Sequence, residues 1–88
     1  MGSAMAEVIV YATPWCPYCV RARHLLQSKG VDYTLIDVSA DRAKRVEMTQ
    51  KAGRTSVPQI WINKEHIGGC DELMALDRAG KLDKKLNA

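Results

Sequence analysis

A pair of cysteines placed between a strand and a helix restricts the fold of this chain more than any other feature. Residues 13–19 read TPWCPYC, and the segment before them, EVIVYA at 7–12, is rich in β-branched residues and predicts a buried strand. After them, apolar residues recur at the spacing of one helix face, with Cys19 among them. Cys16 therefore lies at the start of a predicted helix, as its N-cap residue or next to it.

The rest of the chain alternates between strand-like and helix-like patterns. After a first helix that Gly30 is suited to end, these patterns predict strands at 31–38, 59–63 and around His66-Ile67, helices at 39–53 and 70–80, and a short polar helical end at 81–86. Ser39 or Asp41 is the expected N-cap of the second helix. The helical crossover between the first two strands requires parallel pairing, whereas the last two strands are close enough for a hairpin. We therefore predict an α/β fold of order β-α-β-α-β-β-α, with a four-stranded mixed sheet flanked by helices.

Length, apolar runs and charge limit the class of protein. The 88 residues suffice for one domain, which we expect at 7–88, with residues 1–6 as an added or disordered N-terminal extension. No apolar run approaches the roughly 18 residues of a membrane-spanning helix, and nothing signals secretion, so we expect a cytoplasmic protein that does not enter a membrane. A formal net charge of +3 with only two Trp and three Tyr is too little for a nucleic-acid-binding surface.

The start of the first helix makes the two cysteines inequivalent. Pro17 suits the first helical turn, because its missing N–H costs nothing there. The free N–H groups of Tyr18 and Cys19 can point at the Cys16 sulfur, and the helix dipole favours negative charge at the same place. We therefore expect Cys16 to be a thiolate nucleophile, and Cys19, one turn further along the apolar face, to be a less exposed resolving thiol.

Other uses of the cysteines fit less well. A zinc site needs four ligands; Cys70, His24 and His66 could join the pair, but there is no second Cys-x-x-Cys, and the position between strand and helix is unlike a zinc knuckle. Covalent haem requires a His directly after Cys19, where Val20 stands. Three cysteines do not form a disulfide framework, which leaves a purely structural pair as the remaining alternative. A redox pair within a βαβ pattern is the interpretation that the spacing favours.

Three motifs in this order resemble those of a known family. CPYC at 16–19, TSVPQIWIN at 55–63 and HIGGCDEL at 66–73 together resemble a dithiol glutaredoxin of the thioredoxin-like superfamily, over about residues 7–86. The resemblance implies the thioredoxin-like fold and a glutathione-dependent oxidoreductase that reduces protein disulfides and protein–glutathione mixed disulfides. Thioredoxin-like electron donors are the nearest alternative. However, thioredoxins carry Gly-Pro between their cysteines and are longer, and the small glutaredoxin-like donors lack the GGCD motif.

The resemblance also implies how backbone groups bind glutathione. Val57-Pro58 matches the cis-proline loop of the family, where the Val57 N–H and C=O would pair with the cysteine backbone of glutathione like a short added strand. Gly69, Cys70 and Asp71 open a predicted helix, and their N–H groups would bind the γ-glutamyl carboxylate. The Asp71 carboxylate would face the ammonium group, unless it is an ordinary acidic residue of a first helical turn.

Two side chains and one departure from the family pattern complete the implied site. Tyr18 would line the glutathione groove, and Arg45, by family spacing, would bind the glycyl carboxylate. The alternatives are an exposed helix residue for Tyr18 and a solvated helix-face arginine for Arg45. Many relatives carry a Lys three positions before the first cysteine; here that residue is Thr13, which removes one charge contact. Cys70 matches a third cysteine of some relatives, and we expect no catalytic role for its thiol.

The implied mechanism uses glutathione as co-substrate and no metal, in a chain that we expect to be a monomer. Cys16 would attack a glutathionylated substrate, and Cys19 would resolve mixed disulfides with proteins. An alternative of another class is an iron–sulfur carrier, in which two chains hold a [2Fe–2S] cluster through Cys16 of each and two glutathiones. Pro17 counts against it, because cluster-binding relatives usually have a smaller residue there. His24 and His66 are expected to be surface residues.

Overall fold

The computed structural model describes residues 6–87, and its elements follow the predicted order. The elements are β1 (Val8–Ala12), α1 (Pro17–Ser28), β2 (Thr34–Asp37), α2 (Arg42–Ala52), β3 (Gln59–Ile62), β4 (Glu65–Gly68), α3 (Cys70–Arg78) and α4 (Leu82–Leu86). The β-α-β-α-β-β-α order is confirmed, and α4 is the short helical end that follows it. Asp41, not Ser39, caps α2, because its carboxylate accepts the Lys44 N–H at 3.1 Å.

The strand predicted at 31–38 is shorter in the structure, where β2 begins at Thr34. The residues before it belong to the packing of α1 instead. Val31 is buried in the core under α1, and the Tyr33 hydroxyl accepts a hydrogen bond from Arg23 of that helix at 3.1 Å. These contacts with α1 divert the chain, so that strand pairing starts three residues later than the sequence pattern indicates.

The beginning of the described chain packs into the fold. Residues 1–5, which form most of the expected N-terminal extension, lie outside the described residues. Ala6, also expected in that extension, is buried, and its N–H donates to the Leu86 carbonyl oxygen at 3.1 Å. The described fold therefore includes Ala6, one residue earlier than the expected boundary.

The four strands form one mixed sheet in the order β2-β1-β3-β4. β1 pairs parallel with β2 and antiparallel with β3, and β3 pairs antiparallel with β4, placing Trp61 opposite His66. The β3–β4 turn is Asn63-Lys64, with φ of 50° and 69°, the left-handed backbone that tight hairpin turns require. The turn thus includes Asn63, which the sequence pattern assigned to the end of the strand at 59–63.

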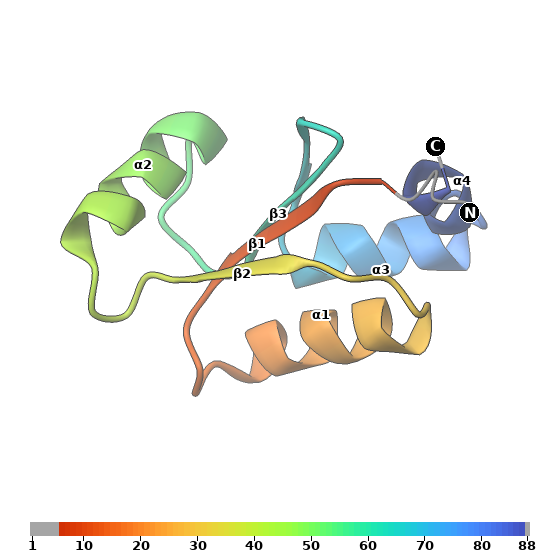
Figure 1. Cartoon of the computed structure of the whole chain (residues 1–88), viewed down its shortest axis with the longest axis horizontal. Helices are drawn as coiled ribbons and strands as arrows, with labels where there is room; N and C mark the ends of the chain where they lie inside the picture. The colour runs from red at the N-terminus through yellow and green to blue at the C-terminus, as the bar shows by residue number, and fades with distance from the viewer. Residues whose placement is uncertain (1–5, 88) are drawn as a thin grey trace.

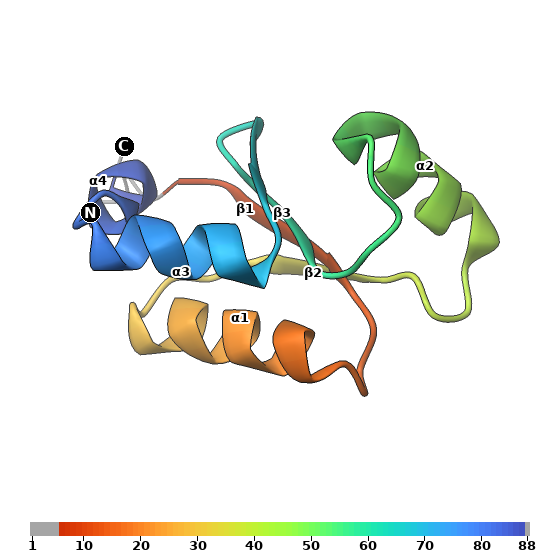
Figure 2. The ribbon, with the colours of Figure 1, turned by 180° about the vertical axis from the view of Figure 1, so that it is seen from behind.

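Helices cover both faces of the sheet. α1 and α3 lie side by side on one face and α2 lies on the other, as both views show (Figures 1 and 2). The larger core fills the space between the sheet and α1 and α3, and a smaller one lies under α2 around Met48 and Trp61. The C-terminal helix was predicted to be polar, but Leu82 and Leu86 of α4 are buried in the larger core. Within residues 6–87 no helix is both long and apolar enough to cross a bilayer.

Candidate active site

Cys16 lies where β1 passes into α1, at the position predicted from the sequence. It is the N-cap residue of α1, with an extended backbone (φ −81°, ψ 122°), and Pro17 occupies the first turn. The first backbone hydrogen bond of the helix runs from the Val20 N–H to the Cys16 carbonyl at 3.0 Å. The N–H groups of Tyr18 and Cys19 precede that bond, at the end of the helix where N–H groups have no partner within the helix and the dipole is positive.

The two thiols of the motif differ in burial. Cys16 is half-buried, whereas Cys19 is 0% exposed on the apolar face of α1. Burial raises the pKa of the Cys19 thiol to about 11; a hydrogen bond with the Thr13 backbone opposes this shift, and the neighbouring Cys16 adds to it. Cys19 is therefore a protonated thiol near neutral pH, while Cys16 is the accessible member of the pair.

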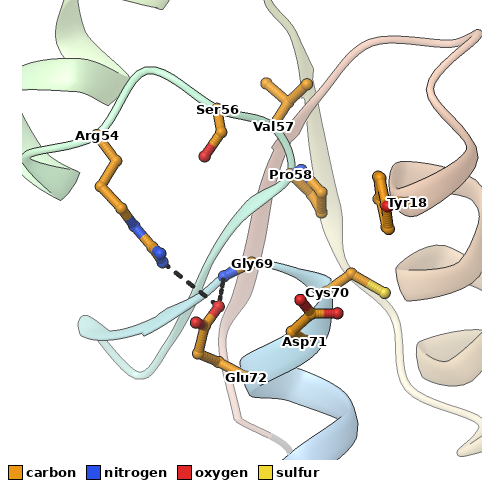
Figure 3. Close-up of a pocket in the computed structure, with 9 residues that line it drawn as sticks. All are labelled: Tyr18, Arg54, Ser56, Val57, Pro58, Gly69, Cys70, Asp71 and Glu72. Atoms are coloured by element: carbon orange, nitrogen blue, oxygen red, sulfur yellow. Dashed lines mark hydrogen bonds and ion pairs between the residues drawn. The ribbon is translucent and has the colours of Figure 1, made fainter.

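A pocket of about 190 Å³ opens beside Cys16 and collects residues from three segments of the chain (Figure 3). We call it the Val57 pocket. It is lined by Tyr18 of α1, by Arg54, Ser56, Val57 and Pro58 of the segment before β3, and by Gly69, Cys70, Asp71 and Glu72 at the start of α3. The Cys16 sulfur lies 3.9 Å from the Val57 carbonyl oxygen, which puts the thiol next to this pocket.

Most of the residues expected to bind glutathione line the Val57 pocket. They are Tyr18, Val57, Pro58, Gly69, Cys70 and Asp71. The Val57-Pro58 peptide bond is cis, as the resemblance implied. In Figure 3 the Cys70 sulfur points away from the Arg54 side of the pocket, and burial, followed by the charge of Asp71, raises the pKa of its thiol.

Arg45 is the expected ligand that the structure does not bring to the Val57 pocket. It lies on α2, where its guanidinium donates to the Thr55 carbonyl oxygen at 3.2 Å. It lines a separate hollow on the α2 side, together with Arg42 and Val46. The Arg45 guanidinium is therefore bonded to the backbone of the loop before β3, whereas other residues of the same loop line the Val57 pocket.

Arg54 is the cation that does line the Val57 pocket, and the sequence reasoning missed it. Figure 3 shows its side chain on one side of the pocket and Tyr18 on the opposite side. Its Nη2 lies 3.4 Å from a carboxylate oxygen of Glu72. The signal that could have found it is its position three residues before Val57, on the same loop.

The start of α3 is less open to a ligand than the sequence suggested. The Gly69 N–H, expected to bind an anion, donates to the Glu72 carboxylate at 2.7 Å instead (Figure 3). The N–H groups of Cys70 and Asp71 remain in the first turn of α3. Gly68 allows this arrangement, because it has φ of +118° and a Cβ there would lie 2.8 Å from both the Arg54 Nη2 and the Glu72 carboxylate.

The histidines lie outside the pocket. His24 is exposed on α1; His66 is exposed on β4 and makes a 2.8 Å hydrogen bond with Gln59. In the part of the chain that the structure describes, no three His, Cys, Asp or Glu residues are grouped as metal ligands would be.

The comparison with known proteins assigns this arrangement to a family. Residues 8–67 match the family model described as Glutaredoxin. The chain belongs to the glutaredoxin family. The glutaredoxin of Pseudomonas aeruginosa PAO1 is 56% identical over 84 residues, covering 96% of this chain and 100% of the relative. Glutaredoxin 3 of Escherichia coli K12 is 52% identical over 82 residues, covering 93% of this chain and 99% of the relative.

A solved glutaredoxin structure has the same fold. The crystal structure of a buckwheat glutaredoxin–glutathione complex matches this glutaredoxin with a TM-score of 0.86 and 32% sequence identity. The match covers 92% of this chain and 76% of the buckwheat chain. The predicted thioredoxin-like glutaredoxin fold, with its four-stranded mixed sheet, is therefore confirmed.

Proposed function

We propose that this glutaredoxin is a glutathione-dependent thiol–disulfide oxidoreductase of the dithiol class. Its substrates are protein–glutathione mixed disulfides and protein disulfides. The observation that carries the proposal is the accessible Cys16 thiol at the start of α1, 3.9 Å from the Val57 carbonyl oxygen beside the Val57 pocket. A thiolate is the attacking species in thiol–disulfide exchange, and Cys16 is the accessible thiol of the pair.

The chemistry of the Val57 pocket complements glutathione. The tripeptide carries two carboxylates, one ammonium group and a cysteine with its own backbone. The Val57 N–H and C=O would pair with that cysteine backbone as a short added strand. The N–H groups of Cys70 and Asp71 would bind the γ-glutamyl carboxylate, and the Asp71 carboxylate the ammonium group. Arg54, which lines the pocket, would supply the cation for the glycyl carboxylate.

The first reaction removes glutathione from a protein. The Cys16 thiolate attacks the glutathione sulfur of the mixed disulfide, forming a bond between Cys16 and glutathione. The substrate thiolate leaves and takes a proton from water. A second glutathione thiolate then attacks the bound glutathione sulfur, releasing glutathione disulfide and restoring the Cys16 thiolate. Two electrons pass from glutathione to the substrate, without a metal.

Protein disulfides require the second cysteine. The Cys16 thiolate attacks one sulfur of the protein disulfide and forms a mixed disulfide with the protein; the protein S–S bond breaks, and its other sulfur leaves as a thiolate that takes a proton from water. Cys19 loses its proton and attacks the Cys16 sulfur, which releases the reduced protein and leaves a Cys16–Cys19 disulfide. Two glutathione molecules then reduce that bond. Because every step uses residues of one chain and a reducing glutathione pool, we propose a monomer that acts in the cytoplasm.

A glutathione-coupled assay with a glutathionylated protein tests the assignment of roles. Cys16→Ser should lower the rate by about a hundredfold or more, because a serine hydroxyl is a far weaker nucleophile at neutral pH. Cys19→Ser should retain removal of glutathione but lose reduction of protein disulfides. The opposite pattern, in which Cys19→Ser abolishes removal of glutathione and Cys16→Ser does not, would contradict the proposal. Electrons taken from thioredoxin reductase in preference to glutathione would contradict the choice of co-substrate.

A further inference from the structure

A buried amide lies directly behind the loop that carries Val57. Gln59 is the first residue of β3, and it is 0% exposed. Burying an amide is costly unless its donors and acceptors have partners. In the described chain, no buried side-chain nitrogen or oxygen lacks one. The partners of Gln59 therefore indicate what this residue holds in place.

The amide of Gln59 connects the loop to β4. Its Nε2 donates to the Ser56 carbonyl oxygen at 3.0 Å and to the Ser56 hydroxyl at 3.3 Å. Its Oε1 lies 2.8 Å from Nε2 of His66. The His66 ring is held against Trp61, with ring centroids 4.7 Å apart.

The direction of these hydrogen bonds follows from their chemistry. A carbonyl oxygen only accepts, so the NH2 group of the Gln59 amide faces Ser56 and its oxygen faces His66. His66 Nε2 must then carry a proton. Desolvation of its ring, which packs against Trp61, and then the charge of Arg54 lower the pKa of His66, while Glu72 opposes the shift. A neutral imidazole has one N–H, and this geometry puts it on Nε2, which in turn keeps the amide from rotating.

Holding the Ser56 carbonyl also orients the Val57 N–H. The two groups belong to one planar peptide unit, in which C=O and N–H point in opposite directions. With its C=O bonded to Gln59 on the core side, this peptide directs the Val57 N–H away from the core. We propose that Gln59 and His66 are positioning residues that hold the Ser56–Val57 peptide in the orientation that binds the glutathione cysteine, an inference that rests on the proposed function.

The test compares variants that differ in one hydrogen-bonding group, in a glutathione-coupled assay on a glutathionylated peptide. Gln59→Met keeps the length of the side chain but cannot donate to Ser56, and we expect about a tenfold rise in KM with a smaller change in kcat. His66→Phe keeps the ring against Trp61 but removes the N–H, so KM should rise in the same direction. His66→Gln returns an amide N–H near the same place and should restore most of the affinity. Gln50→Met, the same change on the exposed face of α2, is the matched control.

A second measurement detects the surroundings of the Ser56–Val57 peptide unit directly. In a Cys19→Ser background, Cys16 can be loaded with glutathione, and the backbone amide signal of Val57 can be followed by NMR. The Val57 signal should shift on loading, and this shift should shrink in His66→Phe but not in His66→Gln. A purely structural role would lower the thermal midpoint of both His66 variants without separating them in KM or in this shift.

Each outcome decides between the proposals. A folded Gln59→Met with unchanged KM overturns the positioning role. His66→Phe and His66→Gln that show the same KM and the same Val57 shift overturn it as well. His66 is exposed, so its two variants decide the question even if Gln59→Met fails to fold. A wild-type chain without glutathione-dependent activity would instead overturn the proposed function itself.

Discussion

Residues of the same type have different surroundings in this glutaredoxin, because the fold buries one member of a pair or bonds its side chain elsewhere. Cys16 and Cys19 belong to one motif, yet Cys19 is 0% exposed and burial raises its pKa to about 11. Arg45 and Arg54 both lie at the loop before β3, yet Arg45 donates to the Thr55 carbonyl oxygen of that loop and Arg54 lines the Val57 pocket. Side-chain position, rather than residue type, therefore decides which cysteine is accessible and which arginine lines the pocket.

The two arginines can be distinguished by mutation. Arg54→Gln should raise the KM for a glutathionylated substrate about tenfold, because it removes a charge-assisted hydrogen bond to a carboxylate. Arg45→Gln makes the same change outside the pocket and should alter KM less than twofold. The measurement is the glutathione-coupled assay, with circular dichroism to check folding. A larger rise in KM for Arg45→Gln than for Arg54→Gln would instead indicate that Arg45 binds the glycyl carboxylate, as family spacing implies.

At the scale of elements, the start of α3 follows directly after β4, the last strand of the sheet, and forms one side of the Val57 pocket. Glu72, in the first turn, accepts the Gly69 N–H at 2.7 Å and lies 3.4 Å from Arg54. One carboxylate thus caps the helix and holds the arginine at the pocket. Gly68 makes room for both groups, since a Cβ there would lie 2.8 Å from each.

The capping contact predicts a pH dependence. The Gly69 N–H, followed by Arg54, lowers the pKa of Glu72 from its ordinary value of 4.5. The folded chain therefore binds this proton less tightly than the unfolded chain, so the contact stabilises the fold above pH 4.5 and is lost as the pH falls through the lowered pKa. Glu72→Gln keeps an acceptor for Gly69 but cannot titrate, and its thermal midpoint should fall less than that of the wild type on acidification. Glu7→Gln, the same change at an exposed glutamate, is the control and should follow the wild type. If the thermal midpoints of the wild type and of Glu72→Gln fell equally with pH, the assignment to Glu72 would be wrong.

At the scale of the whole molecule, α4 joins the end of the described chain to its beginning. Leu82 and Leu86 are 0% and 2% exposed, and the Leu86 carbonyl accepts the Ala6 N–H at 3.1 Å. Figure 1 shows α4 at one end of the molecule and the loop between β1 and α1, which carries Cys16, towards the other. The stabilising contacts of α4 therefore lie away from the loop that carries Cys16, although both adjoin the larger core.

This separation can be tested with a core substitution. Leu86→Ala should lower the free energy of unfolding by about 2–4 kcal/mol, because it removes buried apolar contacts and leaves a cavity. The KM for a glutathionylated substrate should stay at the wild-type value at temperatures where the variant is folded. Urea unfolding and the coupled assay measure the two quantities. A raised KM in the folded variant would mean that α4 is coupled to the Val57 pocket.

Local patterns in the sequence determined the element order and the position of the CPYC motif at the start of α1. The β-branched run before TPWCPYC and the helical spacing after it put Cys16 at a helix start, because both signals depend on neighbouring residues alone. The cis peptide at Val57-Pro58 was predictable only through the family resemblance. The buried leucines of α4 were missed because Leu82 and Leu86 are the only apolar residues in a short charged segment.

Only the tertiary structure decided which groups meet at the Val57 pocket. Arg54 reaches it because of the path of the loop before β3. Gln59 meets His66 because the β3–β4 hairpin brings the two strands together, with Trp61 opposite His66. Contacts of this kind join residues from different elements, so their physical cause is the packing of strands and loops, which no local pattern in the chain encodes.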